Sequence, residues 1–383
     1  MEYLRKQYAL DAKLRIKHNY LFEQFCDSDE IFDGIAKVVS SSAFTLGIEV
    51  TQFEEVFAKS IGVEHAIGVG SGTDAITLSL LALGIEAGDE VIVPSFTFYA
   101  SVGAIISAGA RPVFADIRRD SNIDPHGIAQ LITPRTKAIL VVHWAGRPCA
   151  MDAIQVCAEQ HGIDVIEDAC HAYRAAYKGR YAGTMGATGC FSLHPLKNIN
   201  VWGDGGVVTT NSREIATKIR LLGNHGLIDR DNVAVFGRNS RLDTIQAVVA
   251  NHFMKKVSHT LARRSENASV LDHLLGGKAE IELHTRHSDL RESFQLYSFL
   301  CDDRDSLKKH LQENGIDAKV HYPIPMHLQK PARKWGYNEG DFPVSEHVAR
   351  HTLSIPIHEF VEIEQITEIA NSIVKFYAER QKR

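Results

Sequence analysis

The chain has 383 residues, of which 44% are hydrophobic and 23% are charged. This length allows two domains with a large buried core, and the composition is too apolar for a disordered protein. The formal net charge of −5 argues against a dedicated nucleic-acid binder or a protein that binds anionic membranes. Any phosphate-bearing ligand must therefore be held by a local site, because the overall charge does not attract it.

No segment has the pattern of a targeting signal or a membrane span. The opening twenty residues mix charges throughout and lack the apolar core of a signal peptide. The longest apolar stretch, residues 75–85, is interrupted by Thr77 and Ser79 and is too short to cross a bilayer. The six cysteines are scattered without a CxxC pair, which is typical of reduced thiols. We therefore expect a cytoplasmic protein that contacts neither a membrane nor nucleic acid.

The first two thirds of the chain predict helices followed by an α/β sheet. Apolar residues recur at helical spacing between Ile31 and Val39, so the first fifty residues are predicted to be helical. Between about residues 64 and 225, short apolar strands alternate with helices, which predicts a sheet covered by helices on both faces. The predicted strands are residues 65–69, 90–94, 112–116, 137–142, 164–168, 189–193 and 206–210, with helices that include 101–108 and 151–160.

The remaining third of the chain predicts a smaller unit of mixed structure. A helix that begins near Arg241 leads into it, followed by a strand over residues 294–302 and a helix ending at Gly315. A last helix is expected over residues 361–377. We therefore predict a large α/β domain over residues 1–250, including the N-terminal helical segment, and a small C-terminal α+β domain over residues 251–383.

The first candidate site is the stretch GVGSGTDA (68–75), where a predicted strand turns into a helix. Ligands of open α/β sheets bind at the carboxyl ends of the strands. Backbone N–H groups at a helix N-terminus, with the hydroxyls of Ser71 and Thr73, can cradle a phosphate. Thr73 replaces the third glycine of a dinucleotide fingerprint, and the lysine of a P-loop is missing. An ordinary tight turn explains this stretch equally well.

Two further strand ends carry residues that suit a planar, positively charged cofactor. Asp168 closes the predicted strand 164–168, where a carboxylate is costly unless a positive group meets it. Asp168 can cap the next helix, or it can pair with the protonated ring nitrogen of pyridoxal 5′-phosphate (PLP). Phe98 can lie flat against such a ring, although a place in the apolar core is the simpler explanation for Phe96 and Phe98.

Lys197 lies in FSLHPLKN (191–198), directly after a short predicted strand and before the Gly-rich turn 203–206. Most single lysines are solvated surface charges. A lysine between a sheet edge and a ligand pocket can instead lose hydration and act as an amine nucleophile. Such a lysine would form a Schiff base with an aldehyde cofactor and later move a proton.

Several motifs in chain order resemble the DegT/StrS family of PLP-dependent nucleotide-sugar aminotransferases. They are SGTDA, GDEVIVPSFTF, GARPVFADI, VIEDACHA, FSLHPLKN, GDGGVVTT, NHG, GRNSRLDTIQA and VHYPIPMH, and the likeness runs from residue 44 to residue 360. The resemblance implies the fold of aspartate aminotransferase, fold type I. A large domain with a mostly parallel sheet is then followed by a smaller α+β C-terminal domain.

The resemblance also implies a role for individual residues. Lys197 would hold PLP and move the proton, and Asp168 would keep the pyridine nitrogen protonated. His171 would approach the ring oxygen, and Phe98 would stack on the face opposite the lysine. The cofactor phosphate would be bound by Ser71, Gly72, Thr73 and Ser192, together with Asn239 from a second subunit, so that a homodimer with shared active sites is expected. Tyr322 and His327 would border the sugar-nucleotide pocket.

The implied reaction moves an amino group from L-glutamate to a keto group of a nucleotide-linked deoxy-hexose. Related dehydratases have His in place of the Schiff-base lysine, whereas this chain keeps Lys197. The segments GDGG (203–206) and NSRLDTIQA (239–247) favour carbon 3 over carbon 4. The alternatives are a PLP enzyme acting on a keto-cyclitol or a sugar phosphate, a sugar dehydratase, and a non-catalytic PLP-binding regulator. No basic DNA-binding appendage supports the last of these.

Three features depart from the family pattern. The first forty residues extend beyond the usual start, with no assigned role. Arg147 stands where the family commonly has Gln, and it can touch a phosphate, touch the donor carboxylate or pair with a surface acid. Trp202 lies in a turn near the lysine and can shape the sugar pocket. His347 and His351 have the spacing of a helical metal site but lack a third ligand, so we predict no metal.

Overall fold

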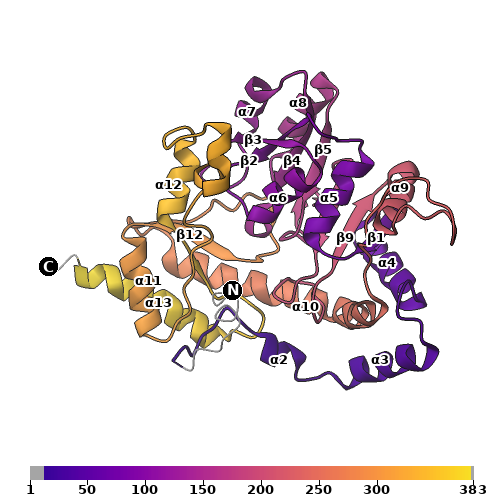
Figure 1. Ribbon diagram of the computed structural model, residues 1–383. Coiled ribbons are helices and arrows are strands. Elements are labelled where there is room, and N and C mark those ends of the chain that lie inside the picture. Colours follow the sequence, from indigo (N-terminus) through magenta and orange to yellow (C-terminus); the bar gives the residue numbers. More distant parts are fainter. Residues whose placement is uncertain (1–12, 381–383) are drawn as a thin grey trace.

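The computed structural model describes residues 13–380 (Figure 1). The first twelve residues, which belong to the N-terminal extension, and the last three lie outside the described part. The predicted helical start is confirmed from Leu21 onward by α2 (Leu21–Phe25), α3 (Asp29–Ser41) and α4 (Ile48–Ile61), whereas residues 13–20 form no helix. Between residues 13 and 380, no helix is both long and apolar enough to span a membrane.

The large domain is built on a seven-stranded sheet in the order β1-β9-β8-β5-β4-β2-β3. The strands are β1 (His65–Val69), β2 (Glu90–Pro94), β3 (Arg111–Ala115), β4 (Thr136–Val142), β5 (Asp164–Asp168), β8 (Thr188–Ser192) and β9 (Gly206–Thr210). Only β9 is antiparallel to its neighbours in this sheet, so every other strand runs in one direction. The carboxyl ends of those strands therefore meet at one edge, where ligands bind in such folds.

Helices cover both faces of this sheet, as the sequence predicts. One face is covered by α5 (Gly72–Ala82), α6 (Tyr99–Ser107) and α9 (Arg213–Gly223); the other is covered by α4, by α7 (Pro125–Ile128), by α8 (Met151–His161) and by the first half of α10 (Thr244–Leu275). Alternate residues of β4 face the two layers: Leu140 packs in the first and Ile139 in the second. Burial on both faces explains why the strand reads as a continuous apolar run.

The C-terminal part packs a three-stranded sheet against long helices (Figure 1). Its strands are β10 (Ile281–Glu282), β12 (Tyr297–Cys301) and β13 (Thr352–Ile355); its helices are α11 (Arg304–Glu313), α12 (Pro343–His351) and α13 (Ile363–Arg380). The 32-residue helix α10 runs across residue 250 without interruption and contributes to the apolar cores of both parts. The expected boundary at residue 250 therefore falls inside one helix.

A third, small sheet joins the two parts beside the ligand edge. It consists of β6 (Ala176–Tyr177), β7 (Arg180–Tyr181) and β11 (Leu290–Arg291). Leu290 pairs with Tyr177, and Arg291 pairs with Ala176. The segment that precedes β12 is thereby fixed close to the turn that follows Asp168.

Candidate active site

The strand ends bring several of the predicted residues together. Asp168 ends β5, Ser192 ends β8, and the turn after β1 enters α5 at Gly72. A small pocket at this edge is lined by residues that include His171, Ser192 and Lys197. These groups come from separate segments, and the sheet topology places them side by side.

Lys197 lies in a turn between β8 and β9, partly buried. Its backbone N–H donates to the His194 carbonyl at 2.8 Å. Burial lowers the pKa of the Lys197 amine, because it disfavours the charged form, and the nearby Cys170 thiol and Asp168 carboxylate partly oppose this effect. A lowered pKa supplies the neutral amine that a nucleophile needs.

Asp168 is 6% exposed, and hydrogen bonds fix both of its carboxylate oxygens. The Ser101 hydroxyl donates to Oδ2 at 2.7 Å, and the Cys170 backbone N–H donates to Oδ1 at 3.1 Å. Ser101 in turn lies 3.0 Å from the Thr97 hydroxyl, which is also buried. The carboxylate therefore has a fixed direction at the end of the sheet and remains available to a cationic partner.

His171 borders the same pocket and is electrically neutral. Burial lowers its pKa well below the ordinary value, and the positive charge of Lys197 acts in the same direction. Its ring lies 5.5 Å from that of Trp144. The Nδ1 atom is buried and has no hydrogen-bond partner among residues 13–380. Buried polar atoms normally have partners, so this nitrogen is placed to meet a bound molecule.

The turn between β1 and α5 has the shape of an anion cradle. Ser71 caps α5, since its hydroxyl accepts the Asp74 backbone N–H at 3.0 Å. A Cβ atom added to Gly72 would lie 2.8 Å from Ser192 Cβ, so a glycine is required where the two turns meet. Thr73 is exposed in the first turn of the helix. The N-terminus of this 11-residue helix lies beside Ser192, and the first N–H groups of a helix have no partner within it.

Phe98 and Tyr322 lie next to each other beside a second, larger cavity. Their ring centroids are 5.7 Å apart, and Tyr322 also contacts Trp144 at 5.5 Å. Both line a cavity of about 460 Å³ whose walls are mostly apolar and include Tyr99, Ile106 and Trp335. The buried Trp144 lies between this cavity and the lysine pocket, because its ring contacts both Tyr322 and His171.

The structure does not place His327 at either cavity. The ring is 1% exposed, lies 3.2 Å from Glu346 through Nε2, and packs against Phe342 with a centroid distance of 4.7 Å. Burial lowers its pKa, and the Glu346 carboxylate opposes this effect. The residue therefore supports the wall formed by its neighbour Met326, which lines the larger cavity.

Asn239 is exposed at the end of a long loop, residues 224–239. The next residue, Ser240, accepts the Gly70 backbone N–H at 3.0 Å, which fixes the base of this loop beside the phosphate cradle. The loop also exposes apolar side chains: Ile228 (67%), Val233 (49%), Val235 (41%) and Phe236 (97%).

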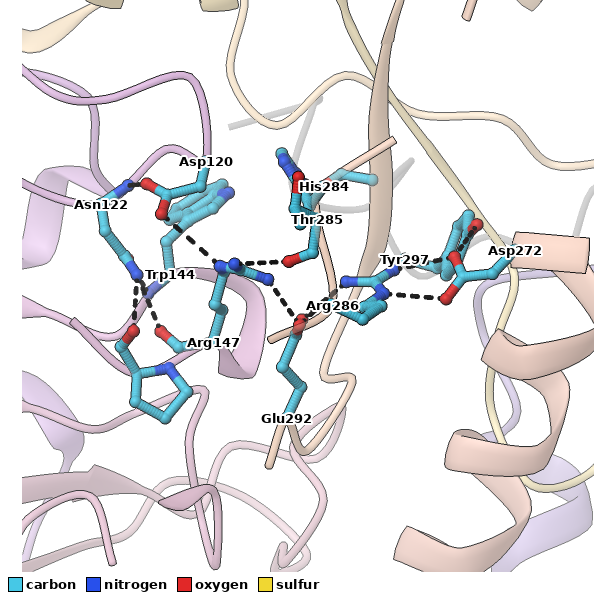
Figure 2. A network of polar contacts seen from close by, with 12 residues as sticks. Asp120, Asn122, Trp144, Arg147, Asp272, His284, Thr285, Arg286, Glu292 and Tyr297 are labelled. Carbon is cyan, nitrogen blue, oxygen red and sulfur yellow. Dashed lines mark hydrogen bonds and ion pairs between the residues drawn. The ribbon is translucent and has the colours of Figure 1, made fainter. Parts of the chain in front are cut away.

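Arg147 is buried in a network of alternating charges (Figure 2). Its guanidinium donates to Glu292 at 2.6 Å and to the Thr285 carbonyl at 2.7 Å, and it lies 3.6 Å from Asp120. Glu292 also accepts from Arg286, which extends the network to α10. Of the three roles considered for Arg147, the structure supports an ion pair, but a buried one that joins the two parts of the chain.

The structure also locates Trp202 and the pair His347 and His351. Trp202 packs against Phe25 and Phe32, with centroid distances of 5.8 and 5.3 Å, so it anchors the N-terminal helices. His347 and His351 stack at 4.1 Å. Within residues 13–380, no group of three or more His, Cys, Asp or Glu side chains is arranged to hold a metal ion.

The residues at the strand ends fit the chemical groups of PLP. Lys197, whose amine pKa is lowered by burial, suits its aldehyde, the fixed carboxylate of Asp168 suits a protonated ring nitrogen, and the unpartnered His171 Nδ1 suits the ring oxygen. The glycine-dependent cradle at Gly72 and Ser192 suits a phosphate. Each requirement is met by a different segment of the chain.

Comparisons with known proteins identify relatives over almost the whole chain. The model of the DegT/DnrJ/EryC1/StrS aminotransferase family matches residues 26–374. A dTDP-3-amino-3,4,6-trideoxy-alpha-D-glucose transaminase from Streptomyces venezuelae is 39% identical over 90% of this chain and 91% of its own length. A UDP-N-acetyl-3-dehydro-alpha-D-glucosamine 3-aminotransferase from Acidithiobacillus ferrooxidans is 40% identical, over 90% and 93%.

A solved structure supports the same assignment. The crystal structure of DesV from S. venezuelae superposes with a TM-score of 0.92 at 37% identity, covering 95% of this chain and 98% of DesV. The expected fold type I and the PLP cofactor are thereby confirmed. The chain is a PLP-dependent transaminase that belongs to the DegT/DnrJ/EryC1/StrS aminotransferase family.

Proposed function

We propose that this enzyme transfers the amino group of L-glutamate to the carbon-3 keto group of a nucleotide-linked deoxy-hexose. The observation that carries the proposal is the pocket lined by Lys197, with Trp144 packed between His171 of this pocket and Tyr322 of an apolar cavity of about 460 Å³. The two curated relatives described above support the substrate class, since both are named for sugars linked to a nucleotide.

In this proposal Lys197 is the catalytic residue. PLP, when bound, withdraws electrons from the carbon that bears the amino group and so acidifies its C–H bond. Lys197 Nζ, with a pKa lowered by burial, holds the cofactor at rest and moves the proton during amino transfer. Asp168 keeps the ring nitrogen protonated through a carboxylate that Ser101 and Cys170 hold in place.

The remaining site residues orient the cofactor and the substrate. His171 Nδ1 would meet the ring oxygen of PLP, and Ser71, Gly72, Thr73 and Ser192 would bind its phosphate at the N-terminus of α5. Phe98 would stack on the ring face opposite the lysine, and Tyr322, which contacts Phe98, would border the sugar. His327 has no direct contact with the substrate in this proposal, because its ring is buried against Glu346.

The choice of carbon 3 rests on the motifs GDGG and NSRLDTIQA and on the names of the relatives, which place the reacting group at carbon 3. Running the reaction in reverse tests this choice, because the amino-sugar nucleotides are stable. Purified enzyme is mixed with 2-oxoglutarate and a dTDP- or UDP-linked 3-amino-hexose, and glutamate formation is followed. The matched 4-amino sugars serve as the control. Glutamate formed only from 4-amino sugars would contradict carbon 3, and formation from neither would favour a cyclitol, a sugar phosphate or a dehydration.

We propose further that the active site is shared between two copies of the chain. The support is the exposed loop 224–239, whose apolar side chains include Phe236, with 97% of its surface exposed. A soluble surface seldom exposes so many large apolar groups on one loop without a partner. Arg238 donates to the Ser107 carbonyl at the end of α6, and α6 also lines the large cavity. In a two-fold dimer, the loop 224–239 of each copy would contact the same surface of the other copy.

A mixing experiment tests the shared site. Lys197→Ala and Asn239→Ala are each expected to be nearly inactive as homodimers. If Asn239 serves the partner's site, each mixed dimer contains one site with neither substitution, and statistical mixing restores on the order of a quarter of wild-type activity. If Asn239 serves its own chain, or if no dimer forms, mixing restores nothing.

A further inference from the structure

The segment Glu292–Gln295, here called the clamp segment, lies between β11 and β12 and contacts the turn that carries Lys197. Gln295 is 9% exposed, and its side-chain amide uses both of its polar atoms on the lysine turn. The Asn198 backbone N–H donates to Gln295 Oε1 at 3.1 Å, and Gln295 Nε2 donates to the Leu196 carbonyl at 2.7 Å. One side chain therefore holds the backbone on both sides of Lys197.

The neighbour Ser293 strengthens the same attachment. Its carbonyl accepts the Asn198 side-chain amide at 2.9 Å, and its hydroxyl donates to the His171 carbonyl at 2.8 Å. Its backbone N–H donates to the Gly146 carbonyl at 3.0 Å. The clamp segment thus joins the turn of Lys197 to the turns that carry His171 and Trp144.

The clamp segment is itself held from behind. Glu292 is bound by Arg147 and Arg286, and the buried Arg264 donates to the Phe294 carbonyl at 3.1 Å. Phe294 has a positive φ of 46°, which a side chain with a Cβ adopts only when its surroundings enforce it. This strained residue sits between the two residues that grip the lysine turn.

We propose that Gln295 is a positioning residue for Lys197, which fixes the direction of the lysine side chain by bridging Leu196 O and Asn198 N. The inference rests on the proposed role of Lys197. A lysine that must hold the cofactor and then deliver a proton to one face needs a fixed backbone, since a misplacement of about 1 Å can slow such a step on the order of 100-fold. The turn has no regular secondary structure of its own, so the bridge supplies the order that a helix or strand would otherwise provide.

The test uses Gln295→Leu, which removes both hydrogen bonds at similar volume, and Gln246→Leu as the matched control. Gln246 also donates a side-chain amide to this loop, to the Trp202 carbonyl at 3.0 Å, but away from Lys197. In the cofactor-free protein, hydrogen exchange at the Asn198 amide should be about 10-fold faster or more in Gln295→Leu and unchanged in the control. In the loaded enzyme, kcat should fall about 10- to 100-fold while KM for the amino-sugar nucleotide stays the same.

A second variant keeps the test decisive if Gln295→Leu unfolds. Gln295→Glu keeps an oxygen that accepts from the Asn198 backbone N–H, but it places a carboxylate next to the Leu196 carbonyl, which then has no donor. We therefore expect kcat to fall again, while hydrogen exchange at the Asn198 amide changes less than in Gln295→Leu. Unchanged exchange and kcat in both variants, or an equal effect of Gln246→Leu, would overturn the proposal. If the wild-type enzyme aminates no sugar nucleotide, the proposed function fails, and Asn198 exchange in the cofactor-free protein still decides on the bridge.

Discussion

Among single residues, the environment of Lys197 sets how readily its amine loses a proton. Burial lowers the pKa of Lys197, so the neutral amine persists at a pH where exposed lysines are charged. In the cofactor-free protein, an acylating reagent followed by peptide mass spectrometry should therefore modify Lys197 at lower pH than the exposed Lys309. Asp168→Asn removes a negative charge that raises this pKa, so the onset should move to still lower pH. A shift to higher pH would contradict this electrostatic account.

Asp168 is expected to matter for chemistry far more than for stability. Asp168→Asn keeps the shape but loses the charge that stabilises a protonated ring nitrogen, so kcat should fall about 10²- to 10³-fold. Asp164→Asn, at the exposed start of the same strand, is the control and should leave kcat unchanged. Steady-state kinetics at saturating PLP separates the two, and equal activity of the two variants would contradict the assigned role.

The sequence predicts which residues carry chemistry better than it predicts where each side chain points. Lys197, Asp168 and Ser192 follow apolar strands, and a parallel sheet brings such ends together regardless of details. His327 belongs to the same motif as Tyr322, yet a short 3₁₀ turn (Met326–Leu328) points it inward to Glu346. The contact between His327 and Glu346, which are 19 residues apart, cannot be recognised from a single sequence.

Among the elements, the close approach of β9 to the phosphate cradle depends on Gly206. A Cβ atom there would lie 2.3 Å from the Ser71 carbonyl oxygen and 2.9 Å from Gly72 N. Gly206→Ala should therefore push β9 away from the cradle, weaken PLP binding and cost about 1–3 kcal/mol of stability.

Gly127→Ala is the matched control for this substitution, because no atom lies within 4 Å of its added Cβ. PLP titration followed by absorbance and denaturant unfolding measure the two effects. Wild-type PLP affinity in Gly206→Ala would show that the cradle lies elsewhere.

The strands and helices with clear periodicity agree with the sequence to within a few residues, for example β2 at 90–94 and α8 at 151–161. The two-residue strands β6, β7 and β11 escape prediction, because so short a segment has no period. Their order depends on pairing between Tyr177 and Leu290, far apart along the chain. Phe294 and Gln295 of the clamp segment were predicted as the start of the strand 294–302, but β12 begins only at Tyr297.

For the whole molecule, the network around Arg147 joins the large sheet to α10 and β12 (Figure 2). Arg147→Met removes the partner of two acids, and Glu292 is 9% exposed, so the free energy of unfolding should fall by about 3 kcal/mol. Arg119→Met breaks the pair with Glu282, whose side chains are 57% and 45% exposed, and should cost less than about 1 kcal/mol. Urea unfolding compares the two, and equal losses would contradict a structural role for the buried network.

Length and composition indicated a globular protein with room for two domains, but they did not reveal that one helix serves both parts. α10 spans 32 residues and packs in both cores, so a cut at residue 250 would divide a continuous element. The sequence predicted a helix that begins near Arg241, whereas the domain boundary was placed where the pattern of strands and helices changes along the chain. The large domain and the C-terminal part meet along α10, because residues of this helix are buried in the cores of both; local composition does not show this.

The most direct test of the account is to locate the lysine that holds the cofactor. The purified enzyme is supplied with PLP, its absorption spectrum is recorded, and it is reduced with borohydride and digested for mass spectrometry. The account predicts a phosphopyridoxyl group on Lys197, its loss in Lys197→Ala, and conversion of the cofactor absorption when glutamate is added before reduction. A label on another lysine, or no label in the wild-type protein, would contradict the central claim.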